Sequence, residues 1–126
     1  MLVVSDEEFQ NLIGEAFAEL PKRQTENLQN VAILYEDEPT PDQREQLKLR
    51  NDQSLYGLYE GVPLAFRQGQ PRLYPDKITI FKNPMLQASA DIAQLKSQIK
   101  HTLWHEIGHF YGLDHDRIHA IEQEWK

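Results

Sequence analysis

One long amphipathic segment, residues 91 to 112, constrains more than any other feature how this chain can fold. Its apolar side chains recur every three or four residues, which is the spacing of one helix face: Ile92, Leu95, Ile99, Leu103, Ile107 and Phe110. Asp91 stands at the expected N-cap, and Gly112 is well placed to end a helix. We therefore expect one helix here, with its apolar face against a core.

Size and composition are those of a small globular protein. The chain has 126 residues, of which 40% are hydrophobic and 26% charged, so we expect residues 1–126 to form a single domain. It contains no Cys, which leaves His and carboxylates as the ligands of any metal. The lack of Cys and of a recognisable signal peptide predicts a cytoplasmic location.

The charge of the chain excludes two classes of partner. The net charge is −7, with Asp and Glu spread along the sequence and no cluster of Lys or Arg. Such a surface repels nucleic acid and anionic lipid. No apolar run is long enough to cross a bilayer. We therefore expect neither nucleic acid nor a membrane among the partners.

The rest of the sequence predicts a mixture of helices and strands. Ser5 and Glu8 form a capping box before a helical stripe that ends at Pro21. Short β-favouring runs at Val31–Tyr35 and Ile78–Phe81 predict two strands, the first of them buried.

The Pro-rich and Gly-rich segments predict connections. Residues 38–46 predict a solvated loop, and residues 52–75 predict turns. Within those turns, Val62–Phe66 is an edge strand at most, because it contains a proline. A helical turn is expected at Met85–Ala88, and a last helix at Asp114–Trp125.

Two histidines lie four residues apart on the long predicted helix. His105 and His109 therefore project from one face, about a turn apart and nearly opposite the apolar stripe. Glu106 follows the first of them and completes the pattern H-E-x-x-H. One side of the helix packs on the core, and the other side offers two imidazoles.

A third imidazole completes the ligand set of a catalytic zinc ion. The string H-E-x-x-H-x-x-G-x-x-H is matched at every fixed position, with Gly112 allowing a turn and His115 returning to the metal. Three protein ligands and an open position for water are typical of catalytic zinc. We predict Zn²⁺ held by His105, His109 and His115, with Glu106 as the general base of a hydrolytic reaction. Four side chains are candidates for a donor to the oxyanion: Tyr111, Tyr74, Tyr56 and Tyr59.

Several neighbouring residues have more than one interpretation. His101 and His119 are best interpreted as exposed surface, and Trp104 as part of the core. Asp114 and Asp116 have three alternative interpretations. They are exposed surface residues, or one of them orients a ligand imidazole, or one of them replaces His115 as the third ligand if that side chain points away.

With these residues, the sequence resembles the zincin metallopeptidases, and its motif is of the metzincin type. Metzincins have a methionine turn after the motif, whereas the two methionines here, Met1 and Met85, both precede it. The sequence is more similar to the minimal, single-domain bacterial zincin-like metallopeptidases. The similarity covers the N-terminal helix, the segments YEDEP, LYGLYEGVPL and DKITIFKNP, and the motif helix.

This resemblance implies an α+β protein with a compact minimal zincin fold. A small mixed β-sheet is expected to pack against the N-terminal helix and the H-E-x-x-H helix. Zincins pair an extended peptide with an edge strand beside the metal, and by resemblance Ile78–Phe81 or the segment Val62–Phe66 is that edge.

The resemblance also implies a zinc metalloendopeptidase with an open cleft. We expect peptides or unfolded protein segments as substrates, and a partner protein that completes the cleft is an open alternative. A zinc-stabilised binding protein without catalysis is the second hypothesis for function. A third hypothesis is an interaction module that binds a partner through the Tyr-rich residues 56–74.

Overall fold

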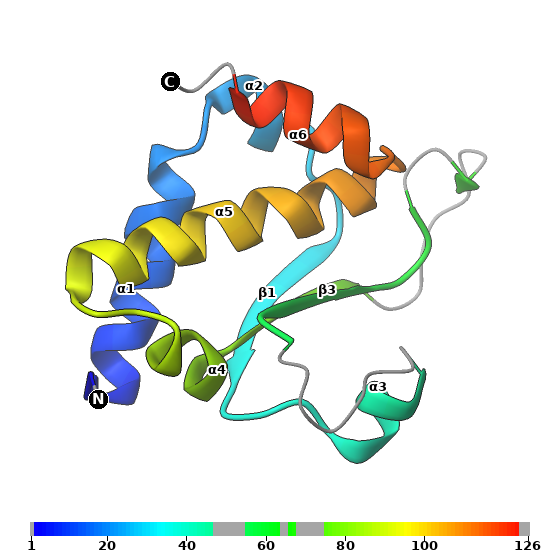
Figure 1. The fold of residues 1–126 in the computed structure, drawn as a ribbon. Coiled ribbons are helices and arrows are strands. Elements are labelled where there is room, and N and C mark those ends of the chain that lie inside the picture. Colours follow the sequence, from blue (N-terminus) through cyan, green and yellow to red (C-terminus); the bar gives the residue numbers. More distant parts are fainter. Residues whose placement is uncertain (1, 47–54, 64–65, 68–74, 124–126) are drawn as a thin grey trace.

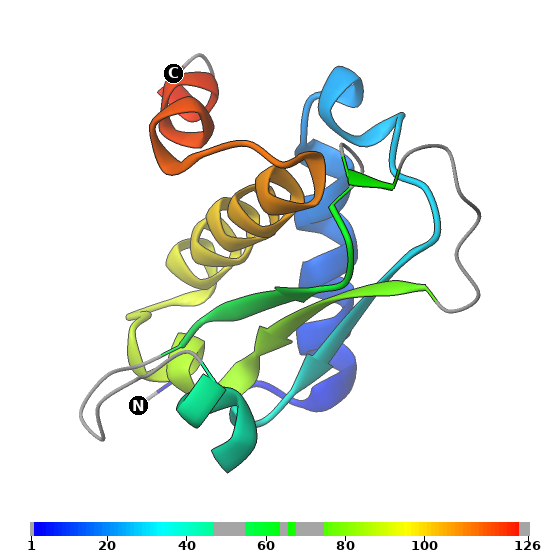
Figure 2. The same ribbon diagram turned by 90° about the vertical axis from the view of Figure 1, so that its right-hand side faces the viewer.

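The computed structural model describes residues 2–46, 55–63, 66–67 and 75–123, and every structural statement below concerns these residues. The elements follow in this order: α1 (Asp6–Glu19), α2 (Lys22–Thr25), β1 (Val31–Glu36), α3 (Pro41–Gln46), β2 (Gly57–Glu60), β3 (Asp76–Phe81), α4 (Lys82–Gln87), α5 (Ile92–Tyr111) and α6 (His115–Gln123). In Figures 1 and 2, α1 and α5 lie on one side of a small mixed sheet, and α3 lies away from them. The predicted α+β fold is confirmed.

The sheet has three strands in the order β1-β3-β2. β1 runs parallel to β3, with Ile33 opposite Ile78, and β2 runs antiparallel to β3, with Tyr59 opposite Ile78. β3 is therefore central and paired on both sides, so the prediction that it is the edge strand beside the metal is wrong. β1 is a sheet edge, which is why it is only half-buried instead of buried as predicted.

The core lies between α1, β3 and α5. The apolar stripe predicted for the long helix is buried, apart from Ile92 at its first position, which is 43% exposed. The largest fully buried side chains of the core are contributed by all three elements, by α4 and by α6: Phe9, Ile78, Ile80, Met85, Leu95, Ile99, Leu103, Trp104, Ile107 and Ile118.

The two long helices begin at the predicted caps. The Ser5 hydroxyl accepts a hydrogen bond from the Glu8 amide at 3.1 Å, and the Glu8 carboxylate accepts one from the Ser5 amide. Asp91 accepts from the Gln94 amide at 2.8 Å. Gly112 ends α5 with φ 81°, a left-handed conformation that favours glycine. These contacts satisfy backbone groups that helix ends otherwise leave unpaired.

The Pro-rich segments hold more structure than predicted. α3 replaces the solvated loop, because the Thr40 hydroxyl caps it through the Gln43 amide at 3.1 Å and Pro41 suits a first helical position. α4 begins directly after β3, three residues earlier than predicted, since a proline is tolerated in the first turn of a helix. α6 begins at His115, one residue later than predicted, and its predicted end lies outside the described residues.

The one strand between residues 52 and 75 of the described chain is also displaced from its prediction. It is β2, Gly57–Glu60, whereas Val62 and Pro63 lie in no strand. Residues 64–65 of the predicted strand lie outside the described residues. A strand that begins at a glycine has a weak β signal, which explains the error. Within the described ranges, no helix combines the length and apolarity that a bilayer span requires.

Candidate metal centre

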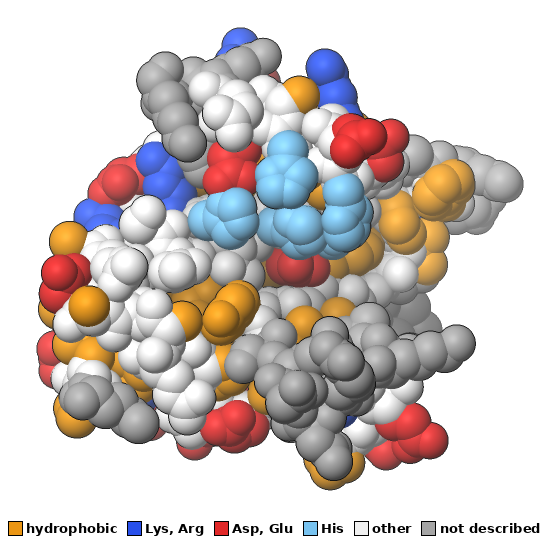
Figure 3. All heavy atoms as spheres, viewed as in Figure 1, with side chains coloured by type: hydrophobic (Ala, Val, Ile, Leu, Met, Phe, Trp, Pro, Cys, Tyr) orange, Lys and Arg blue, Asp and Glu red, His pale blue; other side chains and the backbone are white. Residues whose placement is uncertain are grey.

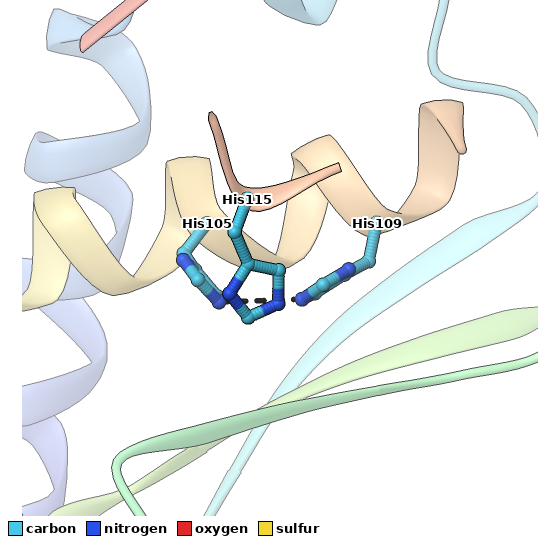
Figure 4. Close-up of side chains that lie close together, drawn as sticks. All are labelled: His105, His109 and His115. Atoms are coloured by element: carbon cyan, nitrogen blue, oxygen red, sulfur yellow. Dashed lines mark hydrogen bonds between the residues drawn. The ribbon is translucent and has the colours of Figure 1, made fainter. Parts of the chain in front are cut away.

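Three histidines come together beside α5. His105 and His109 project from α5, and His115 reaches them from the first position of α6 (Figure 4). The Nε2 atoms of His105 and His109 are 3.2 Å apart. One ring nitrogen of each histidine can be chosen so that all three lie within 4.8 Å of one another. This cluster could hold a metal ion.

The spacing and chemistry of the cluster fit zinc. Two nitrogens that bind zinc at about 2.0–2.1 Å in a tetrahedron lie about 3.3 Å from each other. The pair on α5 already has this separation, at 3.2 Å, and a ring nitrogen of His115 lies within 4.8 Å of both. Imidazole is a ligand that suits zinc, although other late first-row metals accept it as well.

The turn between α5 and α6 brings His115 to the other two histidines. The Leu113 amide donates to the Gly108 carbonyl at 3.0 Å, which closes the turn at Gly112. Asp114 accepts from the Arg117 amide at 2.8 Å and so caps α6. The cluster of described residues that could hold a metal ion contains His115 and neither Asp114 nor Asp116.

Burial and mutual proximity keep the α5 histidines neutral. Burial, and then the neighbouring His109 and His115, lower the pKa of His105 to about 4. Burial and His115 also lower the pKa of His109. Because a metal binds the neutral imidazole, both side chains are in the binding form at neutral pH.

Glu106 is buried between the histidines and the sheet. Its side chain is largely inaccessible, and its Oε1 accepts a hydrogen bond from the Tyr59 amide at 2.9 Å. Burial raises the pKa of Glu106 to about 7, although the Tyr59 amide opposes part of this effect. A carboxylate with such a pKa can exchange a proton near neutral pH, as a general base requires.

A groove of about 740 Å³ lies against the histidines and Glu106. One of its walls is β2 with the turn that follows, and the other is the end of α5 with the start of α6. Apolar side chains from both sides line it, among them Leu55, Pro63 and Leu113. Figure 3 shows the histidine side chains gathered on one exposed face of the molecule, with an acidic group beneath them.

The edge strand at this groove is β2. Phe81 donates its amide to the Tyr56 carbonyl at 2.9 Å, so the alternate residues Gly57 and Tyr59 direct their backbone groups away from β3. Tyr59 uses its outward amide to hold Glu106. The strand beside the candidate metal centre is therefore neither of the two segments that the sequence indicated.

Two of the four tyrosines considered as oxyanion donors are already bonded elsewhere. The Tyr111 hydroxyl donates to the Gln24 carbonyl at 2.7 Å. The Tyr59 hydroxyl donates to Asp76 at 2.5 Å. Tyr56 is 37% exposed, and Tyr74 lies outside the described residues.

Sequence reasoning missed a buried network behind the groove wall. Arg67 pairs with Asp76 and donates to the carbonyls of Val62 and Gln29, at 3.0 and 3.1 Å. Burial alone would raise the pKa of Asp76, but the hydrogen bonds from Tyr59 and Arg67 outweigh it and lower that pKa. The network anchors the turn after β2. Asp76, a charged residue that begins the β-favouring run DKITIF, was the signal in the sequence that could have indicated it.

Gly57 permits the close approach of β2 to α5. A Cβ at this position would lie 2.5 Å from Cγ2 of Thr102, which is itself buried. We expect Gly57→Ala to lower the free energy of unfolding by about 1–3 kcal/mol, because an extra methyl overpacks the contact. Gly14→Ala, on the exposed side of α1 with no atom near the new methyl, should stabilise by about 1 kcal/mol.

Urea denaturation of both variants measures this difference. Equal stability changes in the two variants would contradict the close packing of β2 on α5.

A helix that carries H-E-x-x-H beside the free edge of a small mixed sheet defines a zincin-type protein. The family model of zincin-like metallopeptidases matches residues 28–125, and the chain belongs to this family. A solved structure, a conserved hypothetical protein from Thermo thermophilus, is similar with a TM-score of 0.53 and 21% identity. The similarity covers 83% of this chain and 92% of that one, and shows a shared fold. A comparison with curated proteins found no match.

Proposed function

We propose that the protein is a zinc-dependent metallopeptidase that hydrolyses peptide bonds in peptides or unfolded protein segments. One observation carries the proposal: Glu106, a buried carboxylate, lies between a cluster of three imidazoles and the outward edge of β2. A metal site alone would not need a buried acid, because burial of a carboxylate costs free energy even when it accepts one hydrogen bond.

In this proposal His105, His109 and His115 hold the zinc ion. When bound, zinc supplies Lewis-acid chemistry, which activates water and polarises the carbonyl of the scissile bond. Glu106 accepts the proton of the attacking water and then delivers it to the nitrogen of the leaving amine. The Tyr59 amide fixes the orientation of the carboxylate, which limits the motion needed for each proton transfer.

The substrate would bind as an added strand along β2. Gly57 directs its backbone N–H and C=O outward, and the C=O of Tyr59 points the same way, so an extended peptide finds hydrogen-bonding groups there. The groove is open, which suits peptides and unfolded segments better than folded proteins. We also propose that a partner protein completes the groove. Nucleic acid is not proposed as a substrate, because the chain has a net charge of −7.

A non-catalytic zinc site is the second candidate. Its supporting observation is that the ligands come from both α5 and α6, so a bound ion would cross-link the two helices. Such a site would raise the melting temperature on zinc binding, and Glu106→Gln would leave the function unchanged. The peptidase proposal instead requires that Glu106→Gln remove hydrolysis.

The first test is the metal content of protein purified without a His-tag or chelator. We expect near-stoichiometric zinc in the wild-type protein by plasma mass spectrometry and its loss in His109→Ala, because two imidazoles bind zinc weakly. His119→Ala, an exposed histidine of α6, is the matched control and should keep its zinc. A folded wild-type protein that holds no zinc and cannot be reloaded would rule out the peptidase proposal.

A further inference from the structure

The third histidine belongs to α6, a helix that docks on α5 through one face. His115, Ile118 and Glu122 follow one another at spacings of three and four residues, so they share this face. Ile118 is the one fully buried side chain among the described residues of α6. The docking of this face therefore decides where the His115 imidazole lies.

The surface of α5 that receives α6 is shaped for Ile118. A Cβ at Gly108 would lie 2.5 Å from Cγ1 of Ile118, so a glycine is required for this approach. Trp104, one turn earlier on α5, donates its Nε1–H to the Ile118 carbonyl at 3.0 Å inside the core. The side chain and the backbone of one α6 residue are thus both held by α5.

A third contact holds the far end of α6. The Nδ1 atom of His101 pairs with the Glu122 carboxylate, which is largely buried. His101, Trp104 and Gly108 have the spacings three and four, the same as the contact residues of α6. The two helices therefore meet in one antiparallel register, with α6 lying alongside α5 as Figure 1 shows.

We infer that Trp104, Gly108 and the His101–Glu122 pair are positioning residues that set the register of α6 and so complete the metal site through His115. This role rests on the proposed function in one respect, namely that the histidine cluster binds zinc. A ligand atom displaced by more than a few tenths of an ångström no longer fits the coordination sphere. Small changes in the docking of α6 will therefore weaken zinc binding without touching a ligand.

A double-mutant cycle tests this route of action. Trp104→Phe keeps an aromatic ring in the core but removes the bond to the Ile118 carbonyl. We expect it to raise the zinc dissociation constant roughly ten-fold, measured by competition with a chromophoric chelator. In a His115→Ala background the same change should leave the constant unaltered, because the residue that it positions is gone.

Gly108→Ala tests the register without deleting a core group. Alanine favours the helical state of α5 more than glycine does, so a loss of affinity cannot come from a weaker α5. We expect weaker zinc binding and an altered absorption spectrum of the Co²⁺-loaded protein, both partly restored by adding Ile118→Ala. Far-ultraviolet circular dichroism checks that each variant remains folded.

Two exposed histidines provide a matched pair of variants. His101→Ala removes a contact with α6 and should lower zinc affinity a few-fold. His119→Ala, one turn after His115 on the same helix, should leave the affinity unchanged.

Equal effects of Trp104→Phe with and without His115, or no effect of Trp104→Phe and Gly108→Ala, would overturn the positioning role. If the wild-type protein binds zinc and hydrolyses peptides but the effect of Trp104→Phe does not depend on His115, only the positioning role is overturned. A wild-type protein that binds no zinc would overturn the proposed function together with it.

Discussion

Glu106→Gln is expected to lower the rate of peptide hydrolysis by about 10²–10⁴-fold, the contribution typical of a positioned general base. Glutamine has nearly the same shape and can still accept the hydrogen bond from the Tyr59 amide, but it cannot take up a proton. Zinc should remain bound, because the three histidines are unchanged. The measurement is cleavage of a fluorogenic peptide library, paired with the zinc content of the same sample.

The control for this variant is a glutamate of β2 that does not line the groove. Glu60→Gln changes the last residue of β2, whose carboxylate accepts from the Gln43 side chain at 3.3 Å and not from the site. Its hydrolysis rate should stay within about two-fold of the wild type, because no proton is transferred there. Hydrolysis that survives in Glu106→Gln would remove Glu106 from the mechanism and favour the non-catalytic zinc site.

The second large effect is that Glu106 lowers the free energy of unfolding of the metal-free protein as the pH rises. The pKa of Glu106 is about 7 in the folded chain, against an ordinary value of 4.5. Between these two values the folded protein holds a proton that the unfolded chain has released. Stability due to this group is therefore fully present below pH 4.5 and is lost as the pH rises through 7. The shift corresponds to about 3 kcal/mol at about 1.36 kcal/mol per pKa unit.

The histidines act in the opposite direction. His105 has a lowered pKa of about 4 in the folded chain, so the unfolded chain binds more protons below pH 6.5 and the protein loses stability on acidification. His109, with its lowered pKa, adds to this trend. The two effects oppose each other between about pH 4.5 and 6.5, which would hide the contribution of Glu106 in the wild-type protein alone.

A comparison with Glu106→Gln separates the contributions. The histidine effect is common to both proteins, so the difference in their free energies of unfolding reports Glu106. With chelator present, this difference should shift by about 3 kcal/mol in favour of the variant between about pH 4 and pH 8. Guanidinium denaturation at several pH values measures it. A difference that does not change with pH would mean that Glu106 is solvated in the metal-free protein.

The local part of this fold follows from the sequence. The caps of α1 and α5, the apolar stripe of α5 and the glycine that ends it were all predicted, because each depends on residues three or four apart. The motif spacing likewise predicted that His105 and His109 share a helix face and that His115 returns after a turn, and the structure brings these three side chains together. Whether they bind zinc stays a prediction until metal content is measured.

The tertiary structure alone decided which strand lies beside the histidines. β3 has the clearest strand signal but is central, whereas the edge is β2, which begins at Gly57 and has a weak signal. Strand order depends on pairing between distant segments, which local patterns do not record. For the same reason the Tyr59 amide on Glu106, the choice of Arg67 as the partner of Asp76, and the fit of Ile118 against Gly108 did not follow from the sequence. The sequence by itself determined the ligands that the chain can offer, and only packing between distant segments decided the groove and strand edge that surround them.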